Sequence, residues 1–323
     1  MYRRALNKDV KCGDAWFRLG LTNLKLSDPR EAHKDFTRAM ELDPSNTDAL
    51  SKLGDLDLLL YAANPKTNQG MLADLEDVAE RLLKKDSRSF DGLRFAGEIA
   101  LIRSDVKAAI RKFEAANQAL RNQPELVLEL AQTLMVDRQF ERAEALAREL
   151  ISKEKTYAPI YDWLYVYYLR TNRAQLAEDL LKQKVENNPS EGAYLLQLAF
   201  HYYRNDRKAE MEAAIERLVS NPKQFTEARL GVGDFYVRIG QLRKALEQYS
   251  EGQKENPKNN RAYRKKMVEV LGTQGRNEQA SALVASILKE DPNDSEAIAL
   301  QATLLLQKSG KGQVKQVLRS FNH

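Results

Sequence analysis

Residues 13–46 read GDAWFRLGLTNLKLSDPREAHKDFTRAMELDPSN. In the first half, Trp16 and Gly20 lie four residues apart, on one stripe of a helix of period 3.6. A turn follows in which Pro29 takes a place that tolerates the loss of a backbone N–H. The second half carries its own stripe, in which alanines flank Phe36, and an Asp-Pro pair ends it. The segment therefore predicts two amphipathic helices joined by a short turn.

The same plan recurs along the chain with a nearly constant period, about the length of this segment. Prolines follow one another at almost equal intervals, at Pro189, Pro222, Pro257 and Pro292. A tyrosine, with an arginine two positions later, recurs at one fixed interval, at Tyr168 and Arg170, Tyr202 and Arg204, and Tyr236 and Arg238. A fixed period of this length indicates stacked structural repeats, in which each unit buries its apolar faces against its neighbours.

The repeat resembles the tetratricopeptide repeat (TPR), whose motif is W-x2-L-G-x2-Y, then A-x3-F-x2-A, then P. The first full unit supplies Trp16, Leu19, Gly20, Ala32, Phe36, Ala39 and Pro44, with Asn23 in place of the tyrosine. The resemblance implies an all-α fold: one α-solenoid over residues 1–323, a right-handed superhelix of about nine helix-turn-helix repeats.

The motif divides the chain into consecutive repeats. Their expected bounds are 13–46, 47–89, 90–123, 124–157, 158–191, 192–225, 226–260, 261–294 and a partial unit at 295–323. An insertion at 61–70, rich in Asn, Pro and Gly, is expected to form a loop inside the second repeat. Residues 1–12 are expected to be the end of a preceding repeat. Because neither end resembles a polar capping helix, we expect the chain to be a segment of a longer protein.

Composition argues against several classes of chemistry. The chain has one cysteine, Cys12, and three histidines, so we expect neither an internal disulfide nor a metal centre. No phosphate-binding, nucleotide-binding or metalloprotease motif occurs. We therefore expect no cofactor and no catalytic activity. No apolar run approaches the roughly 20 residues of a membrane span.

The net charge of +5 is unevenly placed. Between Lys254 and Arg319 there are 12 Lys and Arg against 7 Asp and Glu, and the rest of the chain balances. The densest part is RAYRKKM, at Arg261–Met267. A basic patch could meet phosphates, but +5 on 323 residues is mild, and nucleic acid is not the expected partner.

In each first helix, the motif residues leave a second stripe, and in TPR proteins that stripe lines the concave groove. The resemblance thus implies a binding surface for an extended peptide or a partner helix. Its expected residues are Asp162, Arg170, Phe200, Tyr203, Arg204, Asp234 and Arg238. The arginines have an alternative explanation, because cations near the end of a helix also stabilise its dipole. Of the nearby aromatic residues, Tyr161, Tyr168 and Tyr202 fill motif positions and are expected in the core, with at least one other exposed.

Two other functions stay open on the sequence. Long arrays of this kind resemble parts of bacterial cell-envelope systems for exopolysaccharide export or protein sorting, where the solenoid would be structural or would bind glycan. The protein would then be periplasmic if its full-length form carries an export signal, and otherwise cytoplasmic. In a third interpretation the array recruits substrates for a catalytic domain outside this segment.

Overall fold

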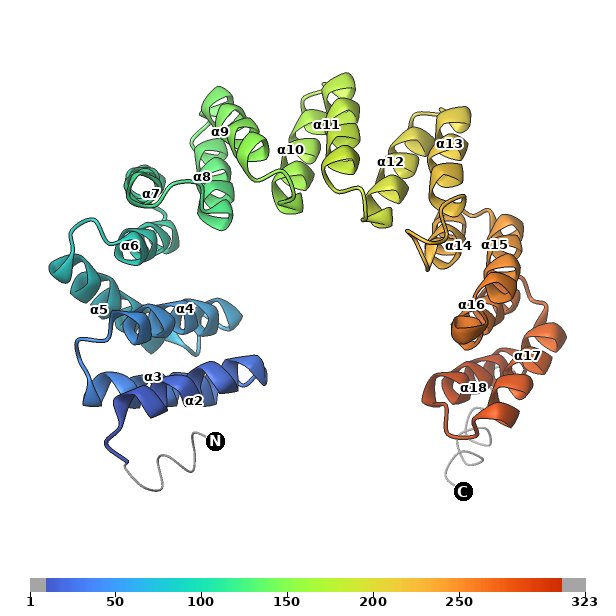
Figure 1. Cartoon of the computed structure of the whole chain (residues 1–323), viewed down its shortest axis with the longest axis horizontal. Coiled ribbons are helices and arrows are strands. Elements are labelled where there is room, and N and C mark those ends of the chain that lie inside the picture. The colour runs from blue at the N-terminus through green and yellow to red at the C-terminus, as the bar shows by residue number, and fades with distance from the viewer. Residues whose placement is uncertain (1–9, 310–323) are drawn as a thin grey trace. The chain divides into compact units, whose positions relative to one another are not determined.

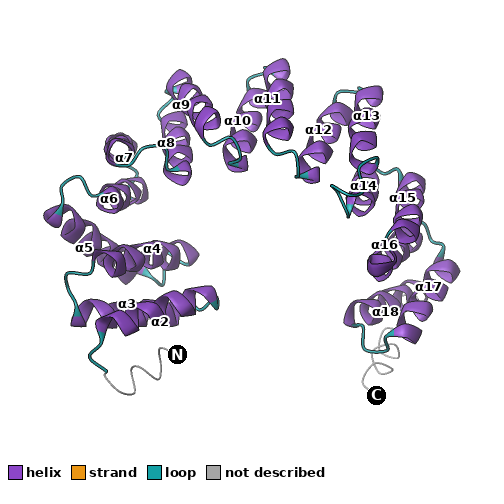
Figure 2. Ribbon diagram, in the orientation of Figure 1, coloured by secondary structure: helices purple, strands orange, loops and turns teal. Residues whose placement is uncertain are grey.

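The computed structural model describes residues 10–309. Over this range the chain forms 17 α-helices, one short 3-10 helix and no strands (Figures 1 and 2). Within each compact unit of the chain the helices follow one another as antiparallel pairs, with α2 (Gly13–Lys25) packed against α3 (Pro29–Leu42) and α14 (Ala228–Arg238) against α15 (Leu242–Glu255), for example (Figure 1). The described residues confirm an all-α solenoid. None of their helices is long and apolar enough to span a bilayer.

The chain divides into two compact units, Met1–Leu164 and Tyr165–His323. The first unit contains α2 (Gly13–Lys25), α3 (Pro29–Leu42), α4 (Thr47–Ala63), α5 (Gln69–Lys85), α6 (Phe90–Ile102), α7 (Val106–Ala119), α8 (Pro124–Val136) and α9 (Phe140–Lys153). Helix α10 (Ala158–Arg170) contributes residues to both units. The second unit continues with α11 (Ala174–Asn187), α12 (Gly192–Arg204), α13 (Lys208–Val219), α14 (Ala228–Arg238), α15 (Leu242–Glu255), η1 (Pro257–Asn259), α16 (Asn260–Thr273), α17 (Asn277–Glu290) and α18 (Ser295–Ser309).

Local sequence chemistry sets the helix ends. The Asp28 carboxylate accepts a hydrogen bond from the backbone N–H of Glu31, which caps α3. Asn46 caps α4 in the same way through the N–H of Ala49. The turn inside most pairs contains one residue with positive φ, at Ser27, Ser104, Arg138, Asn172, Asp206, Gly240 and Gly275. Only two of these are glycines, so the turn is imposed by packing of the pair more than by local preference.

Three of the helix pairs, α2 with α3, α6 with α7 and α14 with α15, depend on a glycine that faces an aromatic ring. A Cβ built on Gly20 would lie 2.6 Å from Cε1 of Phe36, and the rings opposite Gly97 and Gly233 are closer still. The rings belong to Phe36, Phe113 and Tyr249, which are all fully buried and follow their glycines at the same spacing in the sequence. The missing side chain lets the second helix lay its ring against the backbone of the first.

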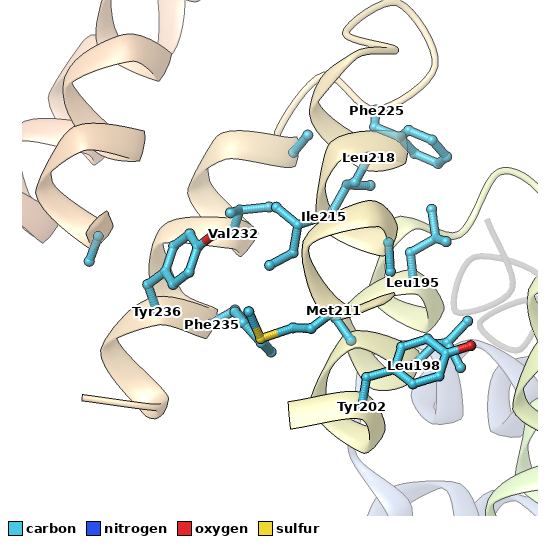
Figure 3. Close-up of a cluster of buried hydrophobic side chains, with 14 of the residues drawn as sticks. Leu195, Leu198, Tyr202, Met211, Ile215, Leu218, Phe225, Val232, Phe235 and Tyr236 are labelled. Carbon is cyan, nitrogen blue, oxygen red and sulfur yellow. The ribbon is translucent and has the colours of Figure 1, made fainter. Parts of the chain in front are cut away.

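The apolar cores join successive helices within each unit. In the second unit, one cluster includes Leu195 and Leu198 of α12, Ile215 of α13, and Val232 and Phe235 of α14. Their side chains point toward one another across the three helices (Figure 3). No helix pair could bury these residues alone, so each repeat stabilises its neighbours.

The buried aromatic residues agree with the motif. Tyr161 and Tyr168 are fully buried and Tyr202 is buried, as the sequence predicts. Tyr203 is 38% exposed, so this region has an exposed aromatic; that such a residue faces a ligand stays a prediction.

The loop predicted at 61–70 is wrong in extent. Helix α4 continues through Ala63, and α5 already begins at Gln69, so the loop is confined to 64–68. Both helices have 17 residues, and the insertion mainly lengthens them. Good helix formers precede Asn64, and the helix ends there because Pro65 follows. The Asn68 side chain closes the loop by donating to the carbonyl of Leu60 at 2.6 Å.

The two terminal predictions fall partly beyond the described range. The repeat end expected at 1–12 lies outside the described residues up to residue 9. At the other end, α18 forms the first helix of the partial unit, and residues 310–323 lie outside the described range.

Replacing Gly233 by Ala tests the glycine–ring contact. The new methyl group would overlap the buried ring of Tyr249, so we expect a loss of about 1–2 kcal/mol in the free energy of unfolding. This net value already allows for the better helix propensity of alanine, worth up to about 1 kcal/mol. Urea unfolding followed by circular dichroism would measure it.

The control is Gly70→Ala, because nothing lies within 4 Å of a Cβ at Gly70. We expect this variant to be as stable as the parent or slightly more stable. Equal stability of Gly233→Ala and Gly70→Ala would contradict the proposed role of the contact.

Candidate functional site

Six of the seven residues predicted to bind a partner lie in the second unit. Asp162 belongs to the first unit, where it is half-buried on the part of α10 that lies in that unit. The six lie on α10, α12 and α14, the first helices of three successive pairs: Arg170, Phe200, Tyr203, Arg204, Asp234 and Arg238.

Four of these residues line one cavity of about 570 Å³ between α12 and α14: Phe200, Arg204, Asp234 and Arg238. The remaining lining residues are Tyr165, Ala193, Leu196, Gln197, Gly231 and Phe235. We call this cavity the α12–α14 groove. Arg170 and Tyr203 do not line it.

The groove exists because α12 and α14 pack directly against each other. A Cβ on Gly231 would lie 3.0 Å from Cδ1 of Leu196, so the glycine allows a close approach at this point. A second cavity, of about 460 Å³, shares Ala193, Leu196, Gly231 and Asp234 with the first. The hollow therefore continues along both helices, with an apolar floor.

Arg238 and the ring of Phe200 form one wall, and Tyr203 packs beside Phe200. The guanidinium of Arg238 lies over the ring of Phe200, 3.9 Å from its centroid. The centroids of the Phe200 and Tyr203 rings lie 6.2 Å apart. A cation over an aromatic face is an attractive contact, so the two helices hold Arg238 in a defined position.

Among the described residues, no carboxylate pairs with the three arginines at the ends of α10, α12 and α14. Arg170, Arg204 and Arg238 are exposed, and none forms an ion pair within the part of the chain that the structure describes. In the first unit, by contrast, Arg94 is paired with Asp55 at 2.5 Å and with Asp91 at 3.2 Å.

Asp234 already has partners within the protein. Its Oδ1 accepts a hydrogen bond of 2.6 Å from the hydroxyl of Tyr249 and lies 3.3 Å from Nζ of Lys266. Burial and this carboxylate raise the pKa of Tyr249 far above its usual value, so the phenol stays a donor. Asp234 therefore fixes the wall of the groove, with about half of its side chain still exposed.

Sequence reasoning did not identify the contact between Tyr165 and His201. The Tyr165 hydroxyl lies 3.0 Å from Nδ1 of His201, which is only 3% exposed. Burial lowers the pKa of His201, so the imidazole is neutral at pH 7. The one available signal was a tyrosine at a motif position that normally holds a small residue. Tyr165 also lines the groove.

The basic segment Arg261–Met267 is neutralised within the fold. Arg261 pairs with Asp291 at 2.8 Å, and Arg264 with Glu290 at 2.5 Å. Lys265 pairs with Asp294 at 2.8 Å, and Lys266 with Asp234. The positive charge counted in this segment therefore does not form a free patch for phosphates.

The corresponding stripe of the first unit is acidic at α6 and α8. Burial and the neighbouring Glu129 raise the pKa of Glu98 to about 9, although Arg94 acts in the opposite direction. Glu98 is thus protonated at pH 7, and its side chain has lost most of its contact with water.

Comparison with known proteins identifies one repeat by family model and many structures of similar fold. Residues 13–46 match the model of the tetratricopeptide repeat. No curated protein matches the chain. Among solved structures, the thermophilic TPR protein TTC0263 of Thermus thermophilus is 20% identical, with a TM-score of 0.46 over 59% of this chain and 100% of its own.

Two further structures are similar in the same way. YrrB, described as a TPR protein with an unusual peptide-binding site, is 16% identical, with a TM-score of 0.41 over 63% of this chain and 97% of its own. A tetratricopeptide repeat protein from Parabacteroides merdae ATCC 43184 is 12% identical, with a TM-score of 0.43 over 75% of this chain and 92% of its own.

The Glu98 carboxyl predicts a specific pH dependence. Its pKa is about 9 in the folded protein against 4.5 for an ordinary glutamate, so its contribution to stability is complete below about pH 4.5 and is lost as the pH rises toward 9. Glu98→Gln keeps a neutral side chain at every pH. We therefore expect the melting temperature of this variant, minus that of the parent, to increase from about pH 5 to about pH 9.

Differential scanning fluorimetry over this range gives the measurement, and Glu80→Gln on the exposed side of α5 is the control. Its difference from the parent should be the same at every pH. A Glu98→Gln difference that is also independent of pH would contradict the assignment.

Proposed function

Because the chain is a tetratricopeptide repeat protein, we propose that it is a scaffold for protein–protein interaction that binds an extended peptide or a partner helix in the α12–α14 groove. The observation that carries this proposal is the convergence of Phe200, Arg204, Asp234 and Arg238 on one cavity with an apolar floor. Peptide sites combine apolar pockets with a few placed polar groups in this way.

The lining chemistry fits side chains of a peptide. Leu196, Phe235 and Ala193 offer apolar surface, and Arg204 and Arg238 offer hydrogen-bond donors. Aromatic and arginine side chains are enriched among the residues that dominate binding energy at interfaces. The groove supplies both types within one cavity.

The titratable groups of the groove support recognition more than acid–base chemistry. Asp234 is engaged by Tyr249 and Lys266, and His201 is buried with a lowered pKa. We therefore propose a function without catalysis.

The alternative role, a structural or glycan-handling segment of a bacterial envelope system, has weaker support. Sugar rings commonly stack on open aromatic faces, and the guanidinium of Arg238 covers one face of Phe200. A protein partner uses the arginine and the ring together.

Filling the groove tests the proposal. Ala193 is exposed and lines both cavities, so Ala193→Trp should occupy the hollow without disturbing the core. Partners captured from a lysate of the source cells would be quantified by mass spectrometry. We expect the amount of captured partner to fall about tenfold or more with Ala193→Trp, which is the effect of losing a central anchor site.

The matched control is Ala209→Trp, at an exposed position of α13 that does not line the groove. It should retain the partner. A photo-cross-linker in place of Tyr203 would then locate the bound segment. If Ala193→Trp and Ala209→Trp capture all partners equally well, the groove is not the binding site.

A further inference from the structure

We propose that the bound segment is an acidic peptide that carries a carboxylate at every third residue. Its carboxylates pair with Arg170, Arg204 and Arg238, and an apolar side chain between them enters the α12–α14 groove. This inference rests on the proposed function and specifies the chemistry of its partner. We call the three residues the arginine row.

The arginine row carries positive charge that no acidic side chain of the described residues neutralises. Its members occupy the same position in the last turn of three first helices, one repeat period apart, and all three are exposed. Within residues 10–309 they have no ion pair, whereas Arg229, on the same unit, is held by Glu251 and Glu255. A favourable interaction with the helix dipole accounts for a cation at each helix end, but not for two of them lining a cavity.

One cation of the row is already positioned. Stacking on Phe200 holds the Arg238 guanidinium over the groove while the N–H groups at its edge can still donate. A planar guanidinium held in this way loses less side-chain entropy when it binds a carboxylate. Phe200 itself is only half-buried and packs beside Tyr203. The arrangement favours a planar anion such as a carboxylate.

The distance between neighbouring helices can be compared with the repeat distance of a peptide. Helices α12 and α14 are in direct contact, and packed helices lie roughly 8–10 Å apart. In the polyproline II conformation, residues three apart point the same way and are separated by about 9.3 Å. In a β-strand, residues on one face repeat at about 6.6 Å, which does not match. A peptide in the polyproline II form therefore presents carboxylates at about the spacing of α12 and α14, which carry Arg204 and Arg238.

A nucleic acid fits less well. The carboxylate of Asp234 also lines the cavity, but it is paired with Lys266 and does not distinguish a phosphate from a carboxylate ligand. The denser basic segment Arg261–Met267, which would extend a phosphate track, is already paired with acidic residues. The observations thus favour a peptide.

Synthetic peptides of fixed composition test the proposal by fluorescence anisotropy. The first probe is a labelled, N-acetylated and C-amidated peptide with aspartate at every third position and proline and leucine between. The second has the same composition with its aspartates contiguous, and the third replaces aspartate by lysine. We expect the first to bind about tenfold or more tightly than the second, and the third not to bind.

Two double variants show whether the row is responsible. Arg204→Gln with Arg238→Gln removes two cations of the row. Arg217→Gln with Arg243→Gln removes the same charge from exposed positions on α13 and α15 that do not line the groove. We expect Arg204→Gln with Arg238→Gln to lower the affinity for the peptide with aspartate at every third position about tenfold or more, since each charge-assisted contact is strong. The second pair should change its affinity less than about twofold.

Several results would overturn the inference. They are equal affinity for spaced and contiguous aspartates, equal loss in both double variants, or no binding of the spaced peptide at about 1 mM. Tighter binding of an oligothymidylate of matched charge, lost with the row, would assign the row to nucleic acid instead. In any of these cases, loss of the captured partner with Ala193→Trp alone would leave the proposed function standing. Failure of the groove variant itself would remove both.

Discussion

The contact on which three of the helix pairs depend, including the pair beside the groove, is that between a glycine of one helix and an aromatic ring of the next. Where Gly233 faces Tyr249, the ring lies against the backbone of α14 and is fully buried. Close packing of this kind fixes both the distance and the rotation of the two helices. It also decides which side of α14 remains outside the core. The surface available to a partner is therefore a consequence of how the pair is packed.

Helix α14 also lacks a side chain on a second face, the one that contacts α12. Gly231 lets Leu196 of α12 approach, while Gly233, two residues later, admits the ring from α15. Two glycines thus bring α14 close to both neighbours and leave its third side for the stripe that holds Asp234. Because Gly233 has no side chain, the Tyr249 ring lies beside it and its hydroxyl donates to the carboxylate of Asp234. Tyr249 thus belongs to the core through its ring and holds the groove residue Asp234 through its hydroxyl.

Sequence periodicity was sufficient for the helices and for much of the groove, because both follow from spacing along the chain. The period placed Phe200, Arg204, Asp234 and Arg238 on one stripe, and these four line one cavity. The contact of Tyr165 with His201 could not be predicted, since it depends on a side chain that crosses between two repeats. The same reason applies to the stacking of Arg238 and to the length of the loop at 64–68, which packing of longer helices decides.

Charge shows most clearly what counting residues leaves out. The sequence places its excess of cations near Arg261–Met267, but there each basic side chain meets a carboxylate from a neighbouring element. The arginine row lies in a stretch whose formal charge balances, yet its cations have no such partner in the described structure. Ion pairs at a surface contribute little to stability but they do cancel the local field. The charge left unpaired is therefore set by contacts in the fold, and the arginine row on α10, α12 and α14 keeps its charge although the composition there is balanced.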